Sequence, residues 1–194
     1  SYDSRETLGR LPELTGVMKG EGEKTFAKLC KVYGKRSETS ELSLEQIDGI
    51  TFRCPDGTIC ERPWRVPMDL SEVPFVYHDM KKFENKIIYY ETSRGCPFSC
   101  SYCLSSIDKR LRFRSLDLVF NELQFFLDHK VPQVKFVDRT FNCKHDHAMA
   151  IWKYIQEHDN GITNFHFEVA ADLLNDEEIR LIRQMRPGLI QLEI

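Results

Sequence analysis

The chain has 194 residues, of which 41% are hydrophobic and 29% charged, and its formal net charge at pH 7 is −3. This composition is ordinary for a folded globular protein, and the length suffices for one domain or slightly more. No basic block that could form a nucleic-acid surface is present, and no apolar run approaches the roughly 20 residues of a membrane-spanning helix. No charged and then apolar leader opens the sequence, so we expect a cytoplasmic protein.

Residues 1–35 show the pattern of a strand, a glycine turn and a helix. An apolar run over residues 14–18 predicts the strand, and the turn follows at residues 20–23. Apolar side chains at helical spacing indicate the buried face of the helix: Phe26, Leu29, Cys30 and Tyr33. A single strand and helix cannot bury such a face alone, so we expect these residues to end a larger α/β domain.

Residues 36–85 are less regular. A Pro-Asp-Gly turn at residues 55–57 lies between the apolar segments 50–53 and 58–59, which predicts a small hairpin. Three prolines between residues 63 and 74 then interrupt regular structure. The many aromatic and apolar side chains of this stretch favour an ordered connector over a flexible tether.

The cysteines outside the densest cluster have ordinary explanations. Cys30 on the apolar helix face should be buried as a small hydrophobic side chain. Cys54 and Cys60 flank the hairpin turn, where positions on paired strands account for them. The total of seven cysteines is odd, and the apolar content is too high for a small disulfide-held scaffold, so we do not expect a disulfide framework.

From residue 86 onward, predicted strands and helices alternate. The apolar patterns predict strands and helices in turn at residues 86–90, 116–127, 133–138, 148–155, 164–169, 175–185 and 188–194. Asn175 followed by Glu178 matches a capping box at the start of the last helix. Repeated strand–helix units predict an α/β fold with a parallel sheet of about four strands and helices on its outside.

Three cysteines, Cys96, Cys100 and Cys103, lie within eight residues after the first of these strands. The spacing C-x3-C-x2-C supplies three thiolates and no fourth, so a metal centre there keeps one coordination position open. A structural zinc ion needs four nitrogen or sulfur ligands, whereas an iron–sulfur cube can be held by three thiolates. The spacing therefore favours an iron–sulfur cluster with an open iron.

Two alternatives stay open for the same loop. A zinc knuckle could be completed by Cys143, His145 or His147, or the three thiols could be without a metal in a reducing cell. For His145 and His147, positions at the surface or at a helix cap are the simpler interpretation. The corresponding function would be a non-catalytic zinc- or iron–sulfur-binding structural module.

The motif C-x3-C-x2-C, with Tyr102 before its last cysteine, resembles the signature of the radical S-adenosylmethionine (radical SAM) enzymes. The resemblance implies a 4Fe-4S cluster on Cys96, Cys100 and Cys103, with S-adenosylmethionine on the fourth iron. Reductive cleavage of that cofactor gives methionine and a 5′-deoxyadenosyl radical. An electron donor such as flavodoxin or ferredoxin and a small-molecule substrate are also implied. The family core is a partial (βα) barrel with more strands than are expected here, so the chain should be a fragment whose own activity is uncertain.

The order of the upstream segments resembles the junction found in radical SAM enzymes that carry an N-terminal cobalamin-binding domain. This resemblance assigns residues 1–35 to the end of a Rossmann-like cobalamin-binding domain and residues 36–85 to a hairpin and proline-rich connector. Residues 86–194 then form the N-terminal part of the radical SAM core. The same resemblance implies cobalamin as a further cofactor of the full-length protein. It also implies either radical chemistry or cobalamin-linked methyl transfer as the reaction.

Ligands of parallel α/β folds bind at the carboxyl ends of the strands. The polar residues at these ends are Asp138 and Arg139 after the second strand, Glu168 on the third and Glu193 on the fourth. The resemblance implies that they contact S-adenosylmethionine, because carboxylates suit its ammonium group and ribose hydroxyls. Tyr102 is expected to shield the cluster near the adenine.

Three arginines follow the cysteine loop. Arg110, Arg112 and Arg114 could offset the negative charge of a cluster and of a cofactor carboxylate. A solvated surface leading to the next helix, with Ser115 as its N-cap, is the preferred interpretation for at least two of them.

Overall fold

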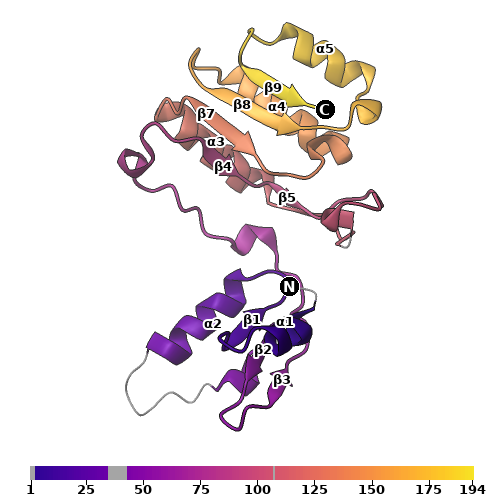
Figure 1. Cartoon of the computed structure of the whole chain (residues 1–194). Helices are drawn as coiled ribbons and strands as arrows, with labels where there is room; N and C mark the ends of the chain where they lie inside the picture. Colours follow the sequence, from indigo (N-terminus) through magenta and orange to yellow (C-terminus); the bar gives the residue numbers. More distant parts are fainter. Residues whose placement is uncertain (1–2, 35–42, 107) are drawn as a thin grey trace. The chain divides into compact units, whose positions relative to one another are not determined.

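The computed structural model of the chain describes residues 3–34, 43–106 and 108–194 (Figure 1). The chain divides into two compact units, Ser1–Met68 and Asp69–Ile194. Residues 36–42 of the predicted connector lie outside the described residues. The cysteine loop and all the predicted cofactor-binding residues belong to the second unit.

The first unit contains a small antiparallel sheet and two helices. Strands β1 (Gly16–Met18), β2 (Ile50–Arg53) and β3 (Ile59–Glu61) are hydrogen-bonded in that order, and the helices are α1 (Ser4–Arg10) and α2 (Glu23–Gly34). The predicted strand, helix and hairpin are confirmed. Their arrangement differs from an isolated strand–helix unit, because β1 pairs antiparallel with β2.

Three details of this unit differ from the expectations. Helix α1 was not predicted, because in its seven residues Leu8 is the one buried apolar side chain. Cys30 is exposed rather than buried, since the apolar face of α2 remains open and Phe26 is 58% exposed. A disulfide joins Cys54 to Cys60, because the hairpin brings their Cα atoms to 6.6 Å.

The predicted segments 1–35 and 36–85 do not coincide with the two compact units. The pairing of β1 with β2 connects the first segment to the second, which places the hairpin in the first unit. The remainder of the second segment, from Asp69, belongs to the unit that contains the cysteine loop. The assignment of residues 1–35 to a cobalamin-binding domain stays a prediction.

The second unit is built on a four-stranded sheet in which every neighbouring pair is parallel. In spatial order the strands are β4 (Ile88–Tyr90), β7 (Gln133–Phe136), β8 (Asn164–Glu168) and β9 (Ile190–Glu193). They alternate along the chain with α3 (Leu116–Asp128), α4 (His145–Glu157) and α5 (Asp176–Gln184). The predicted α/β fold with about four parallel strands, a partial (βα) barrel, is confirmed.

Shorter elements connect these strands and helices. Strands β5 (Ser93–Arg94) and β6 (Arg112–Phe113) form an antiparallel pair that was not predicted. One-turn 3-10 helices cover Leu44–Gln46, Leu70–Glu72, Met80–Phe83, Leu104–Ser106, Phe141–Cys143 and Ala171–Leu173. The predicted capping box of α5 is present, since Asn175 Oδ1 accepts a hydrogen bond from Glu178 N at 2.9 Å and Glu178 Oε2 accepts one from Asn175 N at 3.0 Å.

The strand alternation sends apolar side chains to one face of the sheet and polar ones to the other. On the covered face, Val134, Phe136, Phe165 and Phe167 are fully buried, together with residues of α3 and α4. Both helices lie behind the sheet as it is drawn in Figure 1. The opposite face of the sheet therefore presents the polar residues of β7, β8 and β9. In the described part of the chain, no helix has the length and apolarity to cross a membrane.

Candidate functional site

The cysteine loop leaves the sheet at the carboxyl end of β4, and the β5–β6 pair closes its base. Arg94 lies opposite Arg112 in that pair, and Cys96 N donates a hydrogen bond to the Asp108 carbonyl at 3.0 Å. Cys96 is buried at the base, Cys100 is exposed and Cys103 is half-buried. The base of the loop is thus held by backbone hydrogen bonds, whereas Cys100 lies exposed to solvent.

Gly95 allows the chain to turn into this loop. Its φ is +99°, a region that side-chain-bearing residues rarely adopt. A Cβ at this position would lie 2.4 Å from the carbonyl oxygen of Arg110, which is far inside van der Waals contact. The glycine immediately before Cys96 is therefore required by the backbone on both counts.

The donor set of the loop fits an iron–sulfur cluster by type and number. The disulfide of the described residues lies elsewhere, between Cys54 and Cys60, so all three loop cysteines keep their thiols. Over residues 3–34, 43–106 and 108–194, no three His, Cys, Asp or Glu side chains are close enough together to hold a metal ion. Three thiols on one loop match the number of protein ligands that such a cluster needs.

Asp138 lies beneath the loop rather than on the open face of the sheet. It is 1% exposed, and its carboxylate accepts hydrogen bonds from Thr92 N at 3.1 Å and from Thr92 Oγ1 at 2.7 Å. Burial raises the pKa of Asp138 to about 6. Both carboxylate oxygens are engaged by Thr92, two residues after the end of β4, which gives Asp138 a structural role. Its contact with S-adenosylmethionine stays a prediction.

His147 extends the same network. Its Nε2 lies 3.2 Å from Thr92 Oγ1. Because the hydroxyl of Thr92 gives its hydrogen to the Asp138 carboxylate, His147 must donate through a protonated Nε2. The ring is 4% exposed, and this burial, with a smaller effect of Lys144, lowers the pKa of His147 to about 4.

The expectation that His147 lies at the surface or caps the helix is therefore wrong, because the N-cap residue of α4 is Lys144 and His147 is buried against Thr92. The expectation for His145 is met, because His145 is exposed and its Nδ1 lies 2.9 Å from Glu178 Oε1 at the start of α5. A pattern of two histidines on the first turn of a helix does not show which of them faces the core.

Replacing His147 with glutamine is expected to reduce the loss of stability in acid. Between about pH 6.5 and pH 4, His147 binds a proton in the unfolded chain but stays neutral in the folded one. The folded wild type therefore loses stability relative to the unfolded chain as pH falls through this window. Compared with the variant, the wild type should lose roughly 2–3 kcal/mol between pH 7.5 and 4.5. Urea unfolding of both proteins at the two pH values measures this difference.

The raised pKa of Asp138 acts in the opposite direction, since its stabilising effect is lost as pH rises through about 6. Asp138 is present in both proteins, so its effect cancels in the comparison to a first approximation. A stability difference between wild type and His147→Gln that stays constant from pH 7.5 to 4.5 would contradict a buried, neutral His147.

Glu168 and Glu193 come together on the open face of the sheet, where they are neighbours in the β8–β9 register. Lys135 Nζ lies 3.5 Å from Glu168 Oε1 and 3.2 Å from Glu193 Oε2. His166 Nε2 lies 3.1 Å from Glu193 Oε2. The hydrogen bond from Lys135 lowers the pKa of Glu193. This group of four charged or titratable side chains, the sheet-face cluster, offers both acceptors and a cation to a polar ligand.

Sequence reasoning missed Lys135 and His166. The signal was present, because each is the polar residue between two fully buried apolar residues of its strand. The two other predicted cofactor-binding residues, Arg139 and Tyr102, are exposed, Tyr102 by 90%. Their roles stay predictions.

The arginines after the loop differ from the expected solvated face. Arg110 is exposed, but Arg112 Nη2 lies 2.8 Å from Asp108 Oδ2 and is partly buried. Arg114 is 7% exposed and forms a two-pronged ion pair with Glu122 of α3. Only one of the three arginines is therefore solvated, and the expectation of at least two is wrong.

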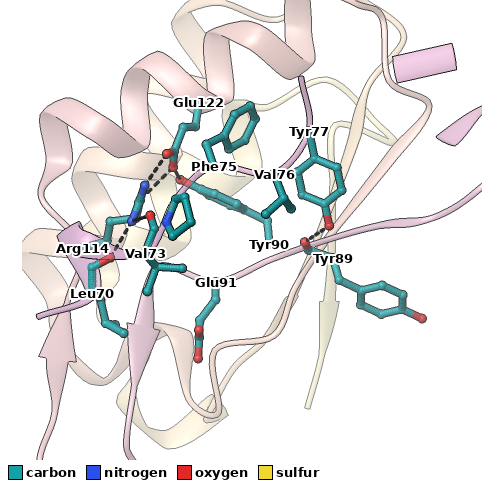
Figure 2. Close-up of a pocket in the computed structure, with 11 residues that line it drawn as sticks. Leu70, Val73, Phe75, Val76, Tyr77, Tyr89, Tyr90, Glu91, Arg114 and Glu122 are labelled. Atoms are coloured by element: carbon teal, nitrogen blue, oxygen red, sulfur yellow. Dashed lines mark hydrogen bonds and ion pairs between the residues drawn. The ribbon is translucent and has the colours of Figure 1, made fainter. Parts of the chain in front are cut away.

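Figure 2 shows how Arg114 also holds the connector. Its Nη1 donates to the carbonyls of Leu70 and Val73, and the Tyr90 hydroxyl donates to Glu122 Oε2. These groups line a half-open pocket of about 170 Å³. Because its buried polar groups pair with one another, the pocket serves to order the connector. The prediction of an ordered connector is confirmed from Asp69 to Tyr77.

Comparison with known proteins gives one matching family and several relatives. The sequence model of the radical SAM superfamily matches residues 90–194. An uncharacterized methyltransferase of Pyrococcus horikoshii is 30% identical over 191 residues, which cover 94% of this chain and 40% of that protein. An anaerobic magnesium-protoporphyrin IX monomethyl ester cyclase of Synechocystis is 29% identical over 109 residues, or 53% of this chain and 21% of the cyclase. The chain thus spans less than half the length of these relatives.

Two solved structures have a similar fold. The radical S-adenosylmethionine methyltransferase TsrM of Kitasatospora setae, with cobalamin and a [4Fe-4S] cluster bound, matches with a TM-score of 0.65 and 18% identity over 91% of this chain and 36% of TsrM. The cobalamin-dependent S-adenosylmethionine radical enzyme OxsB, with aqua-cobalamin and S-adenosylmethionine bound, matches with a TM-score of 0.69 and 22% identity over 92% of this chain and 27% of OxsB. At these identities the likeness concerns the fold.

Proposed function

Because the chain belongs to the radical SAM superfamily, we propose that Cys96, Cys100 and Cys103 hold a 4Fe-4S cluster that binds and cleaves S-adenosylmethionine. The observation that carries the proposal is the position of the loop. Three thiols within eight residues follow the first strand of a parallel sheet, at the edge where ligands of such sheets bind. The cofactors bound in TsrM and OxsB are the ones that the sequence predicts for this protein.

The bound cluster would supply the electron that splits S-adenosylmethionine into methionine and a 5′-deoxyadenosyl radical. The residues of this chain would bind the cluster and orient S-adenosylmethionine. Cys96 would supply one thiolate from the buried base of the loop, and the exposed Cys100 and half-buried Cys103 would supply the other two. Glu168 and Glu193 present acceptors for an ammonium group or for ribose hydroxyls, and Lys135 between them presents a cation for a carboxylate.

The full-length protein would be an enzyme that acts on a small molecule. The family and the named functions of the relatives, methyltransferase and cyclase, support this class of protein. We propose cobalamin as its further cofactor, with cobalamin-linked methyl transfer or radical chemistry as the reaction. A flavodoxin or ferredoxin in the cytoplasm would supply electrons.

Anaerobic reconstitution of the full-length gene product with iron and sulfide tests this function. We expect about four irons and four sulfides per chain and, after reduction, an electron paramagnetic resonance (EPR) signal that changes when S-adenosylmethionine is added. Uptake of zinc alone, or a cluster whose EPR signal S-adenosylmethionine leaves unchanged, would instead support a non-catalytic metal-binding module.

A further inference from the structure

The segment that follows β7 carries buried polar side chains at every second position. Asp138, Thr140 and Asn142 are 1%, 6% and 0% exposed. Each has its polar partner on a different part of the chain, at Thr92, at Cys96 and at Ala170 respectively. The segment therefore connects the end of β4, the base of the cysteine loop and the end of β8.

The two outer residues fix the segment in place. Asp138 accepts two hydrogen bonds from Thr92. Asn142 donates from Nδ2 to the Ala170 carbonyl at 2.8 Å and accepts from Ala170 N at 2.9 Å through Oδ1. Thr140 lies between these anchors, so the backbone that carries its hydroxyl cannot move away from the loop without breaking buried hydrogen bonds, each of which is costly to leave unmade.

The hydroxyl of Thr140 faces the sulfur of Cys96. Thr140 Oγ1 lies 3.7 Å from Cys96 Sγ, and both residues are buried. In a thiol either atom could donate the hydrogen. A cysteine that ligates a metal is a thiolate without a proton, so the hydroxyl must then be the donor.

We propose that Thr140 donates a hydrogen bond to the Cys96 sulfur of the bound cluster and thereby raises the reduction potential of that cluster. The inference rests on the proposed function, since it needs a cluster on Cys96. A donor aimed at a ligand sulfur stabilises the more negative, reduced state of the cluster over the oxidised state. Thr140 thus acts through Cys96: it affects how readily the cluster accepts the electron that the reaction requires.

Three variants of the full-length protein test the inference. Thr140→Val removes the hydroxyl at nearly constant shape, and Thr140→Ser restores it. Thr163→Val is a matched control, because Thr163 is fully buried and its hydroxyl accepts from Asn160 at 2.9 Å in the segment that precedes β8. The readout is the midpoint potential of the reconstituted cluster in an EPR-monitored redox titration.

We expect Thr140→Val to titrate at a more negative potential with an unchanged iron content, and Thr140→Ser and Thr163→Val to titrate close to wild type. A midpoint potential of Thr140→Val equal to that of wild type overturns the inference while leaving the proposed function intact. A wild-type protein that takes up no cluster overturns both, so the two failures are distinguishable.

A second measurement covers the case in which Thr140→Val loses its cluster. Electron–nuclear double resonance of the reduced wild-type cluster in H2O and in D2O detects exchangeable protons close to the cluster. We expect one such proton coupling in wild type and in Thr140→Ser that is absent from Thr140→Ala. A wild-type cluster without any exchangeable proton coupling overturns the inference.

Discussion

Replacing Cys100 with alanine is expected to abolish the iron–sulfur cluster while leaving the helix content of the chain nearly unchanged. Two protein thiolates cannot hold three irons of a cube, so the iron content should fall to near zero. The side chain is exposed on the loop and outside both hydrophobic cores, so its loss removes little packing. Iron and sulfide analysis after anaerobic reconstitution, together with far-ultraviolet circular dichroism, measures both effects.

Cys30→Ala provides the matched control. Cys30 is likewise an exposed cysteine, but it lies on α2 of the first unit, outside the loop. The control variant should take up as much iron as the wild type. Iron content that persists in Cys100→Ala would show that the three loop cysteines are not the ligand set.

The sheet of the second unit was predictable because its information is local. Val134 and Phe136 alternate with polar residues, and α3 and α4 have apolar side chains at helical spacing, so each element can be recognised from its own residues. The β5–β6 pair could not be found in this way. Two residues per strand are too few for an alternation, and the pair depends on the turn at Gly95 and on the loop that it closes.

The candidate site was predictable where a motif defines it and less so where distant residues meet. The cysteine spacing, Glu168 and Glu193 stand out in the sequence, but the partner of Glu193 is Lys135, 58 positions away. The same limit explains why His147 was expected at the surface, since its partner Thr92 is 55 positions distant. Such pairings are determined by tertiary packing, and no local periodicity encodes them.

Asp138 shows how a residue type alone can suggest the wrong surroundings. A carboxylate at a strand end favours a ligand-binding position, yet Asp138 continues the buried parity of Val134 and Phe136 on its strand. Counting by twos from Phe136 predicts that Asp138 points inward, as it does. Parity along the strand was therefore the signal that could have placed Asp138, whereas Asn142 belongs to the 3-10 helix Phe141–Cys143, where that alternation no longer holds.

Replacing Arg114 with methionine is expected to destabilise the second unit by about 3–5 kcal/mol, because it leaves the buried charge of Glu122 without its cation. The two side chains are 7% and 8% exposed, and the guanidinium makes two hydrogen bonds to that carboxylate. Burial, followed by the hydrogen bond to Glu122, raises the pKa of Tyr90, so its hydroxyl stays protonated and remains a donor. One neutral donor cannot replace a guanidinium. Urea unfolding followed by tryptophan fluorescence, to which the buried Trp152 contributes, measures the loss.

A double variant separates the cost of the unpaired charge from the other functions of Arg114. Arg114→Met combined with Glu122→Leu removes both charges, so it should recover much of the stability that the single variant loses. It should still expose the connector to proteolysis, because the carbonyls of Leu70 and Val73 lose their donor in either variant. Arg110→Met, at an exposed position, should change stability by less than about 0.5 kcal/mol. A double variant no more stable than Arg114→Met would show that the connector contacts, and not the pairing of Glu122, account for the stabilisation by Arg114.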